Sequence, residues 1–214
     1  MTIEDTVPSD TSSKEKNKII NEILDKVLTI VEANGDSVID SFGIILDSSG
    51  NYQFAETNET RRLRFVADVY GERYTDDLTE DQKTQSAGDL IHHLCSKRYG
   101  LDDENNDPAY ILKMVNMRYA MGLNSFTQYL TTTLASDVSE ETAAAIMENQ
   151  DLLTGVDIEE DSLRRYTDGE YFASIIGYTG QISQEEYDAL DEDVKDKYSL
   201  SDIVGKSGIE QVFD

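Results

Sequence analysis

Five glycines divide the last part of the chain into short elements and constrain its fold more than any other feature. They are Gly169, Gly177, Gly180, Gly205 and Gly208. Glycine adopts positive φ and accepts close backbone approach more easily than any other residue. We therefore expect a strand leading to Gly169, a short apolar helix, a glycine-bracketed turn, an acidic helix after Ser183 and a second glycine turn. No residue pattern in this stretch is typical of catalysis.

The first helix is predicted by a capping pattern followed by regular apolar spacing. Ser12 with Glu15 three residues later is typical of a helix N-terminus, and apolar residues recur at helical spacing from Ile19 to Val31. Asn34-Gly35 marks the end of this helix. The same spacing predicts further helices at 61–70, 78–94, 108–121 and 139–148.

Strands are predicted where β-branched and aromatic residues gather. Two apolar runs in 41–54 flank Asp47-Ser48-Ser49-Gly50, which is typical of a hairpin. Further strands are expected at 126–134, 155–158 and 163–166. The predicted fold class is therefore α+β, with a mobile lead-in at 1–13, a helix-rich lobe with a hairpin at 14–122 and a mixed lobe of strands and helices at 123–214.

The charge of the chain excludes several classes of function. It has 18 basic and 44 acidic residues, a net charge of −26. Such a surface repels phosphate backbones, so nucleic acid is not an expected partner. No apolar run is long enough for a transmembrane helix, and the acidic start does not resemble a signal peptide. The single cysteine, Cys95, cannot form an internal disulfide, and we expect it to be buried.

Three motifs in the C-terminal stretch resemble those of a known family. Arg165-Tyr166-Thr167-Asp168-Gly169 is similar to Arg-Tyr-Pro-x-Gly, Gly177 to Ser183 reads Gly-Tyr-x-Gly-x-Ile-Ser, and Gly205 to Glu210 reads Gly-x-x-Gly-Ile-Glu. In this order they resemble the pedestal, or dimerisation, domain that precedes the transpeptidase domain in class B penicillin-binding proteins. The motif residues carried over are Arg165, Tyr166, Gly169, Gly177, Tyr178, Gly180, Ile182, Ser183, Gly205, Gly208, Ile209 and Glu210. Thr167 stands where the family has proline, so a less rigid turn is expected there.

The resemblance implies a two-lobed α+β domain with no catalytic residue, metal or cofactor of its own. It implies a parent protein that cross-links peptidoglycan as a D,D-transpeptidase, on the extracytoplasmic face of the bacterial membrane, with an anchor helix outside this chain. The implied partners are a membrane glycan polymerase, other cell-wall synthesis proteins, the catalytic domain of the same parent and a possible second copy. In the family the motif arginine and glutamate belong to a polar cluster, and we hypothesise that Arg165 meets Glu210.

Three short matches to the motifs of penicillin-reactive enzymes lie in the wrong contexts. They are Ser13 with Lys16, Ser49 with Asn51, and Lys206-Ser207-Gly208. A nucleophilic serine needs a nearby lysine that burial keeps neutral enough to take a proton, whereas Ser13 and Lys16 lie in a charged, solvated segment. The second match fits a hairpin turn and the third fits the glycine turn, so we expect no catalysis.

Metal binding is not predicted either. Asp103, Asn105 and Asp107 imitate the start of a calcium loop, but Pro108 and Met114 occupy the positions that need glycine and glutamate. Asp107 is expected to cap the following helix instead. The adjacent His92 and His93 diverge by about 100° on a helix and cannot share a metal, although Asp89 could pair with either.

Two alternative functions stay open at this point. One is an extracellular ligand-binding module unrelated to penicillin-binding proteins, which predicts saturable binding of a small molecule. The other is an acyl enzyme that reacts with penicillin through Ser13 and Lys16, which requires a buried Ser13.

Overall fold

The computed structural model describes residues 11–123, 131–160, 169–190, 192–195, 198 and 203–213. The chain forms two compact units, Met1–Glu159 and Glu160–Asp214. This division differs from the lobe boundary expected after residue 122. The physical reason is that α6 (Glu140–Glu148) packs against α1 (Ser13–Ala33), which joins the segment after residue 130 to the first unit.

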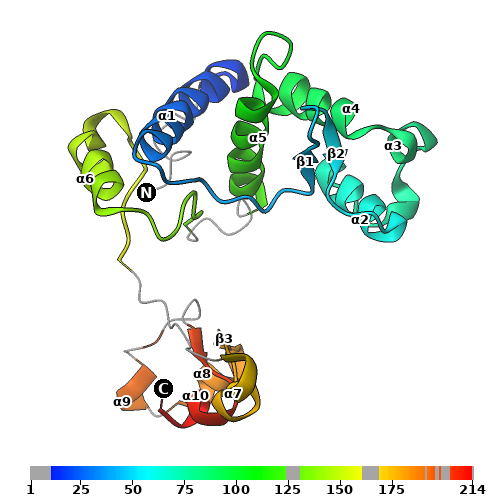
Figure 1. The fold of residues 1–214 in the computed structure, drawn as a ribbon. Helices are drawn as coiled ribbons and strands as arrows, with labels where there is room; N and C mark the ends of the chain where they lie inside the picture. The colour runs from blue at the N-terminus through cyan, green and yellow to red at the C-terminus, as the bar shows by residue number, and fades with distance from the viewer. Residues whose placement is uncertain are drawn as a thin grey trace. The chain divides into compact units, whose positions relative to one another are not determined.

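The first unit is mostly helical, with one small sheet (Figure 1). Its β1 (Ile44–Leu46) and β2 (Tyr52–Phe54) form an antiparallel hairpin in which Ile44 lies opposite Phe54. The remaining elements of this unit, in chain order, are α2 (Glu59–Tyr70), the 3₁₀ turn η2 (Thr75–Asp77), α3 (Glu80–Thr84), α4 (Ala87–His93), the π-helix η3 (Leu94–Tyr99), α5 (Pro108–Leu123) and, after α6, the 3₁₀ turn η4 (Gln150–Leu152).

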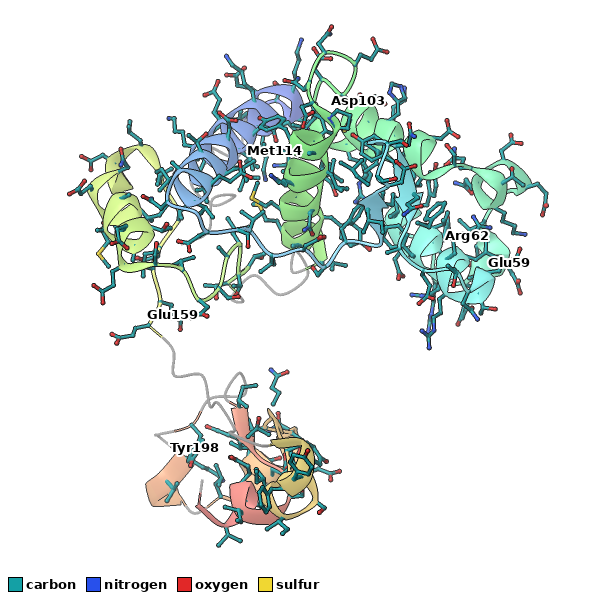
Figure 2. The ribbon with its side chains drawn as sticks, in the orientation of Figure 1. Glu59, Arg62, Asp103, Met114, Glu159 and Tyr198 are labelled. Carbon is teal, nitrogen blue, oxygen red and sulfur yellow. The ribbon has the colours of Figure 1, made fainter. Side chains whose placement is uncertain are left out.

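Helix α1 forms as the sequence predicts. The Ser12 Oγ accepts a hydrogen bond from the Glu15 backbone N at 3.3 Å, and Gly35 follows the helix with φ of 83°. Its apolar face is buried against Met114 of α5, which lies beside α1 in Figure 2, and against Ile146 of α6. This contact makes one of the two core clusters of the first unit.

The second core cluster lies between the hairpin and the helices that follow it. It includes Ile44 of β1, Val66 of α2, Leu90 of α4 and Ile111 of α5, all fully buried. The hairpin turn is the predicted one: Gly50 has φ of 81°, and the Asp47 Oδ1 accepts from the Ser49 N at 2.8 Å. Helix α5 therefore contributes residues to both clusters and joins the two halves of this unit.

The helix predicted at 78–94 is wrong as one continuous element. Helix α3 ends at Thr84, and α4 starts anew after Ser86, whose Oγ accepts from the Asp89 N at 3.1 Å while Asp89 accepts from the Ser86 N. This reciprocal capping box begins a second helix inside the range predicted as one helix. The chain then continues past residue 94 as η3 to Tyr99.

The strand predictions after residue 120 are also corrected where the structure describes them. Residues 131–134 and 155–158 form no strand. Leu134 accepts one backbone hydrogen bond, from the Ile39 N at 2.8 Å, and Val156 and Ile158 pack onto the core cluster of α1 by their side chains. Residues 124–130 and 163–166 lie outside the described residues.

The second unit is built of short elements. Its described elements are α7 (Gly169–Ile176), β3 (Thr179–Gln181), α8 (Gln184–Asp188), α9 (Glu192–Lys195), β4 (Ile203–Gly205) and α10 (Gly208–Phe213). The strands β3 and β4 pair in antiparallel fashion. The predicted apolar helix is α7, and the predicted acidic helix is present as α8 and α9. Together the two units confirm the α+β fold class.

Candidate functional site

The pairing of β3 with β4 brings two of the three sequence motifs together. Thr179 lies opposite Gly205 and Gly180 opposite Val204. The ladder is extended by the Lys206 backbone N, which donates to the Tyr178 carbonyl oxygen at 2.9 Å. Residues 177–183 and 205–210 thus form one cluster, which we call the motif cluster.

Close backbone approach within the motif cluster requires glycine. Gly177 has φ of 87°, and a Cβ added there would lie 1.9 Å from the carbonyl oxygen of Ser207. An added Cβ would also meet backbone atoms at 2.1 Å from Gly205 and at 2.6 Å from Gly208. No real side chain tolerates these distances, so the motif glycines let α7 and α10 contact each other through their backbones.

Polar contacts tie α8 to the same cluster. The Ser183 N donates to the Glu186 Oε2 at 2.7 Å, and the Ser183 Oγ accepts from the Glu186 N at 3.3 Å, which caps α8. The ammonium of Lys206 donates to the same carboxylate, and its side chain is only 14% exposed. The bond from Lys206, followed by those from Ser183, lowers the pKa of Glu186 to about 2. Glu186 is therefore ionised at neutral pH and links α8 to the end of β4.

The other motif residues differ in burial. Ile182 is 5% exposed and Glu210 is 8% exposed, whereas Tyr178 is 65% exposed and Ile209 is 46% exposed. Gly169 begins α7. Arg165 and Tyr166 lie outside the described residues, so the pairing of Arg165 with Glu210 stays a prediction.

Apolar side chains are unusually exposed in the second unit. Seven of them are at least 46% exposed: Tyr171, Phe172, Ile175, Tyr178, Ile203, Ile209 and Val212. Soluble domains seldom leave so many large apolar side chains in water unless another surface covers them.

The residues of the three matches to penicillin-reactive motifs lie in surroundings that differ from those of an active site. Ser13 is exposed in the first turn of α1. The Ser49 and Asn51 backbone N atoms both donate to the Asp47 carboxylate, and the Lys206 ammonium donates to Glu186. None of these groups is placed as a buried nucleophile with a neutral lysine beside it.

The histidines have different surroundings and share no ligand. The His92 Nδ1 lies 2.9 Å from the Asp103 Oδ2, and this hydrogen bond raises the pKa of His92. His93 packs on Tyr70 with ring centroids 4.6 Å apart, and burial lowers the pKa of His93. Among the described residues, no group of three or more histidine, cysteine or carboxylate side chains could hold a metal ion.

Two further sequence expectations are confirmed in the loop and helix around residue 100. The Asp107 Oδ2 accepts from the Ala109 N at 3.0 Å and from the Tyr110 N at 3.2 Å, as a helix cap does. Cys95 is fully buried in η3, and burial raises the pKa of its thiol to about 12. Within the described ranges, every helix is too short or too polar to cross a membrane.

Sequence reasoning missed two hollows that flank α2. One, of about 540 Å³, is lined by Glu59 and Arg62 of α2, labelled in Figure 2, and by residues of β2 and α3. The other, of about 490 Å³, is lined by Thr60, Arg61, Arg64, Tyr74, Thr75 and Asp76. We call the second the arginine hollow. The signal that could have found it is local charge, because residues 61–73 contain four arginines and only two acidic residues.

The fold and the motif cluster are those expected of a penicillin-binding protein pedestal, and comparison with known proteins agrees. The family model of the penicillin-binding protein dimerisation domain matches residues 2–214, so the chain belongs to that family. Over 78 residues it is 33% identical to the peptidoglycan D,D-transpeptidase MrdA of Acinetobacter baumannii. This region is 36% of the chain and 11% of that relative, so the match spans about a tenth of the relative's length.

Proposed function

We propose that this chain is the non-catalytic pedestal of a class B penicillin-binding protein whose parent is a D,D-transpeptidase that cross-links peptidoglycan. The observation that carries the proposal is the family match over residues 2–214, together with the motif cluster that the glycines hold together. The family match favours this role over the alternative of an unrelated ligand-binding module.

In this proposal the pedestal acts on the extracytoplasmic face of the membrane as a spacer and a contact surface. The first unit supports a spacer role because capped helices surround two buried core clusters. We propose that its helices contact a membrane glycan polymerase and other cell-wall synthesis proteins. The motif cluster of the second unit would face the catalytic domain of the same parent, and a second copy is a further possible partner.

The exposure of Ser13 and the local contacts of Ser49 and Lys206 favour a chain without acyl-transfer chemistry. The experiment is an intact-mass spectrum of the 214-residue chain after incubation with excess benzylpenicillin. We expect no added mass, while a penicillin-binding protein with its transpeptidase domain, treated identically, gains one acyl adduct. A stoichiometric adduct on Ser13 would overturn the non-catalytic assignment.

The contact role needs a second experiment. The purified chain, immobilised through its C-terminus, is exposed to the detergent-solubilised glycan polymerase of the same organism. Specific, saturable binding is expected, with an unrelated membrane protein of similar size as the control. Failure to bind at any concentration up to the solubility limit would remove the polymerase from the proposed partners.

A further inference from the structure

The arginine hollow lies in a stretch of net positive charge within a strongly acidic chain. The chain as a whole has a net charge of −26, yet residues 61–73 contain Arg61, Arg62, Arg64 and Arg73 against two acidic residues. An acidic partner is repelled by most of this acidic molecule, and the guanidinium groups of this stretch offset that repulsion locally. This stretch is therefore a candidate approach for an anionic group.

The hollow combines guanidinium groups with an exposed aromatic ring. The side chain of Arg61 is 75% exposed and that of Arg64 is 54% exposed. Tyr74 is 57% exposed, and the Arg73 guanidinium lies over its ring at 5.3 Å. Arginine and tyrosine are, with tryptophan, the residue types enriched among those that dominate the binding energy of protein interfaces.

The walls of the hollow are held in place before any partner binds. The Arg64 Nη1 donates to the Arg73 carbonyl oxygen at 2.7 Å, which fixes the loop after α2 to the helix. The Arg64 Nη2 donates to the Asp68 Oδ1 at 2.6 Å, and the Tyr74 N donates to the Asp77 Oδ2 at 3.3 Å. A site fixed in this way loses less conformational entropy when it binds.

Donor capacity remains on both exposed guanidinium groups. An arginine side chain has five N–H donors. Within the described part of the chain, Arg61 directs one of its nitrogens to Glu56 at 3.1 Å, and Arg64 makes the two bonds given above. The remaining donors of these exposed side chains are available to a carboxylate, which arginine binds with two parallel hydrogen bonds.

We propose that the arginine hollow docks a protein segment that carries a carboxylate next to an aliphatic or aromatic side chain. The carboxylate would bind Arg61 and Arg64, and the apolar side chain would pack on Tyr74. A phosphate headgroup fits less well because Asp76 also lines the hollow and would repel a group of higher negative charge. This inference goes beyond the pedestal role and does not depend on it.

The test measures the binding of short fluorescein-labelled peptides to the 214-residue chain by fluorescence anisotropy. One peptide alternates glutamate with leucine, and its partner alternates glutamine with leucine. We expect the glutamate peptide to bind and the glutamine peptide to bind at least tenfold more weakly. Added salt should weaken the binding, because the contact is made by exposed charges.

Substitutions then locate the binding. Arg61→Gln, at an exposed side chain outside the core, should weaken binding of the glutamate peptide roughly tenfold, as expected when one charge-assisted contact is lost. Tyr74→Ala should weaken the binding of both peptides. The control is Lys18→Gln, which removes a cation from α1 whose side chain is 65% exposed, and it should change nothing.

Three results would each overturn the inference. One is equal binding of the glutamate and glutamine peptides, and another is an Arg61→Gln variant that binds like the original chain. The third is binding of phosphatidylglycerol vesicles, lost in Arg61→Gln, with no binding of the glutamate peptide. That result would assign the hollow to a lipid headgroup instead of a protein.

Discussion

The two units of the chain are stabilised in different ways. Among the described residues, every fully or nearly buried apolar side chain belongs to the first unit, except Ile182. In the second unit the elements meet through backbone contacts at glycines, a capping box and the bond between Lys206 and Glu186. The first unit therefore depends on side-chain packing, and the second depends on backbone geometry.

This difference explains why apolar side chains are exposed to solvent mainly in the second unit. In the first unit the apolar face of α1 is buried against two other helices. In α7, by contrast, every described residue from Tyr171 to Ile175 is exposed. Apolar side chains of the second unit thus contribute little to its own folding, and they are free to contribute to a contact. The comparison predicts that enlarging a glycine will destabilise the second unit, whereas truncating a buried apolar side chain will destabilise the first unit.

The largest effect is expected from Gly177→Ala in the second unit. The added Cβ would lie 1.9 Å from the Ser207 carbonyl oxygen at a φ of 87°. The clash and the backbone strain together should cost about 4 kcal/mol. Hydrogen exchange read by mass spectrometry should show lost protection in residues 169–213 and unchanged protection in α1.

The matched control is Gly35→Ala, which has φ of 83° but no atom within 4 Å of the added Cβ. It should cost about 1 kcal/mol, because only the strain of the left-handed conformation remains. Equal effects of the two substitutions would show that close backbone approach does not hold the second unit together.

The next largest effect is expected from Leu24→Ala in the first unit. Leu24 is fully buried between α1 and its neighbours, and its truncation should cost about 3 kcal/mol through lost burial and the cavity left behind. Val212→Ala, at a side chain 75% exposed on α10, should change stability by less than about 0.5 kcal/mol. Urea denaturation measures both, and a large loss from Val212→Ala would contradict the contrast between the units.

Local features of both units could be predicted from the sequence. The caps at Ser12 and Asp107 and the hairpin turn at Gly50 depend on residues a few positions apart, so their signals lie within one window of sequence. The glycines that separate the short elements of the second unit could likewise be recognised in the sequence. Each of these predictions rests on short-range hydrogen bonds or on backbone conformation.

Sequence reasoning missed features that depend on where one helix ends and another begins, or on contacts between residues far apart in the chain. Residues 78–94 were predicted as one helix, but the capping box of Ser86 and Asp89 begins a new helix within that range. The exposed positions of Arg61, Arg64 and Tyr74 around one hollow depend on the loop after α2, which helical periodicity does not describe. The threonine-rich composition of 131–134 favoured a strand, but these residues form none, and composition alone does not show whether a partner strand is available.

A smaller effect is expected from the cap of α5, which tests the first unit away from its core. Asp107→Ala removes the acceptor for the Ala109 and Tyr110 backbone N–H groups and should cost about 1 kcal/mol. Asp107→Asn keeps an acceptor oxygen and should restore most of the loss. Urea denaturation of both variants checks this, and an unstable Asp107→Asn would point to the negative charge in place of the hydrogen bonds.

The smallest effect is expected on the stability of each unit in acid, because a different carboxylate controls it in each unit. The bond from Lys206 lowers the pKa of Glu186 to about 2, below its ordinary value of 4.5. Because the folded-state pKa is the lower one, the stabilisation is fully present above about pH 4.5 and is lost as the pH falls towards 2. Hydrogen exchange in the second unit should therefore accelerate over this window, and Glu186→Gln should flatten that dependence.

In the first unit, hydrogen bonds from Thr142 and Ser139 lower the pKa of Asp36. Asp36→Asn should flatten the acid dependence there and leave the second unit unchanged, whereas a response in both units to either variant would show that they unfold as one.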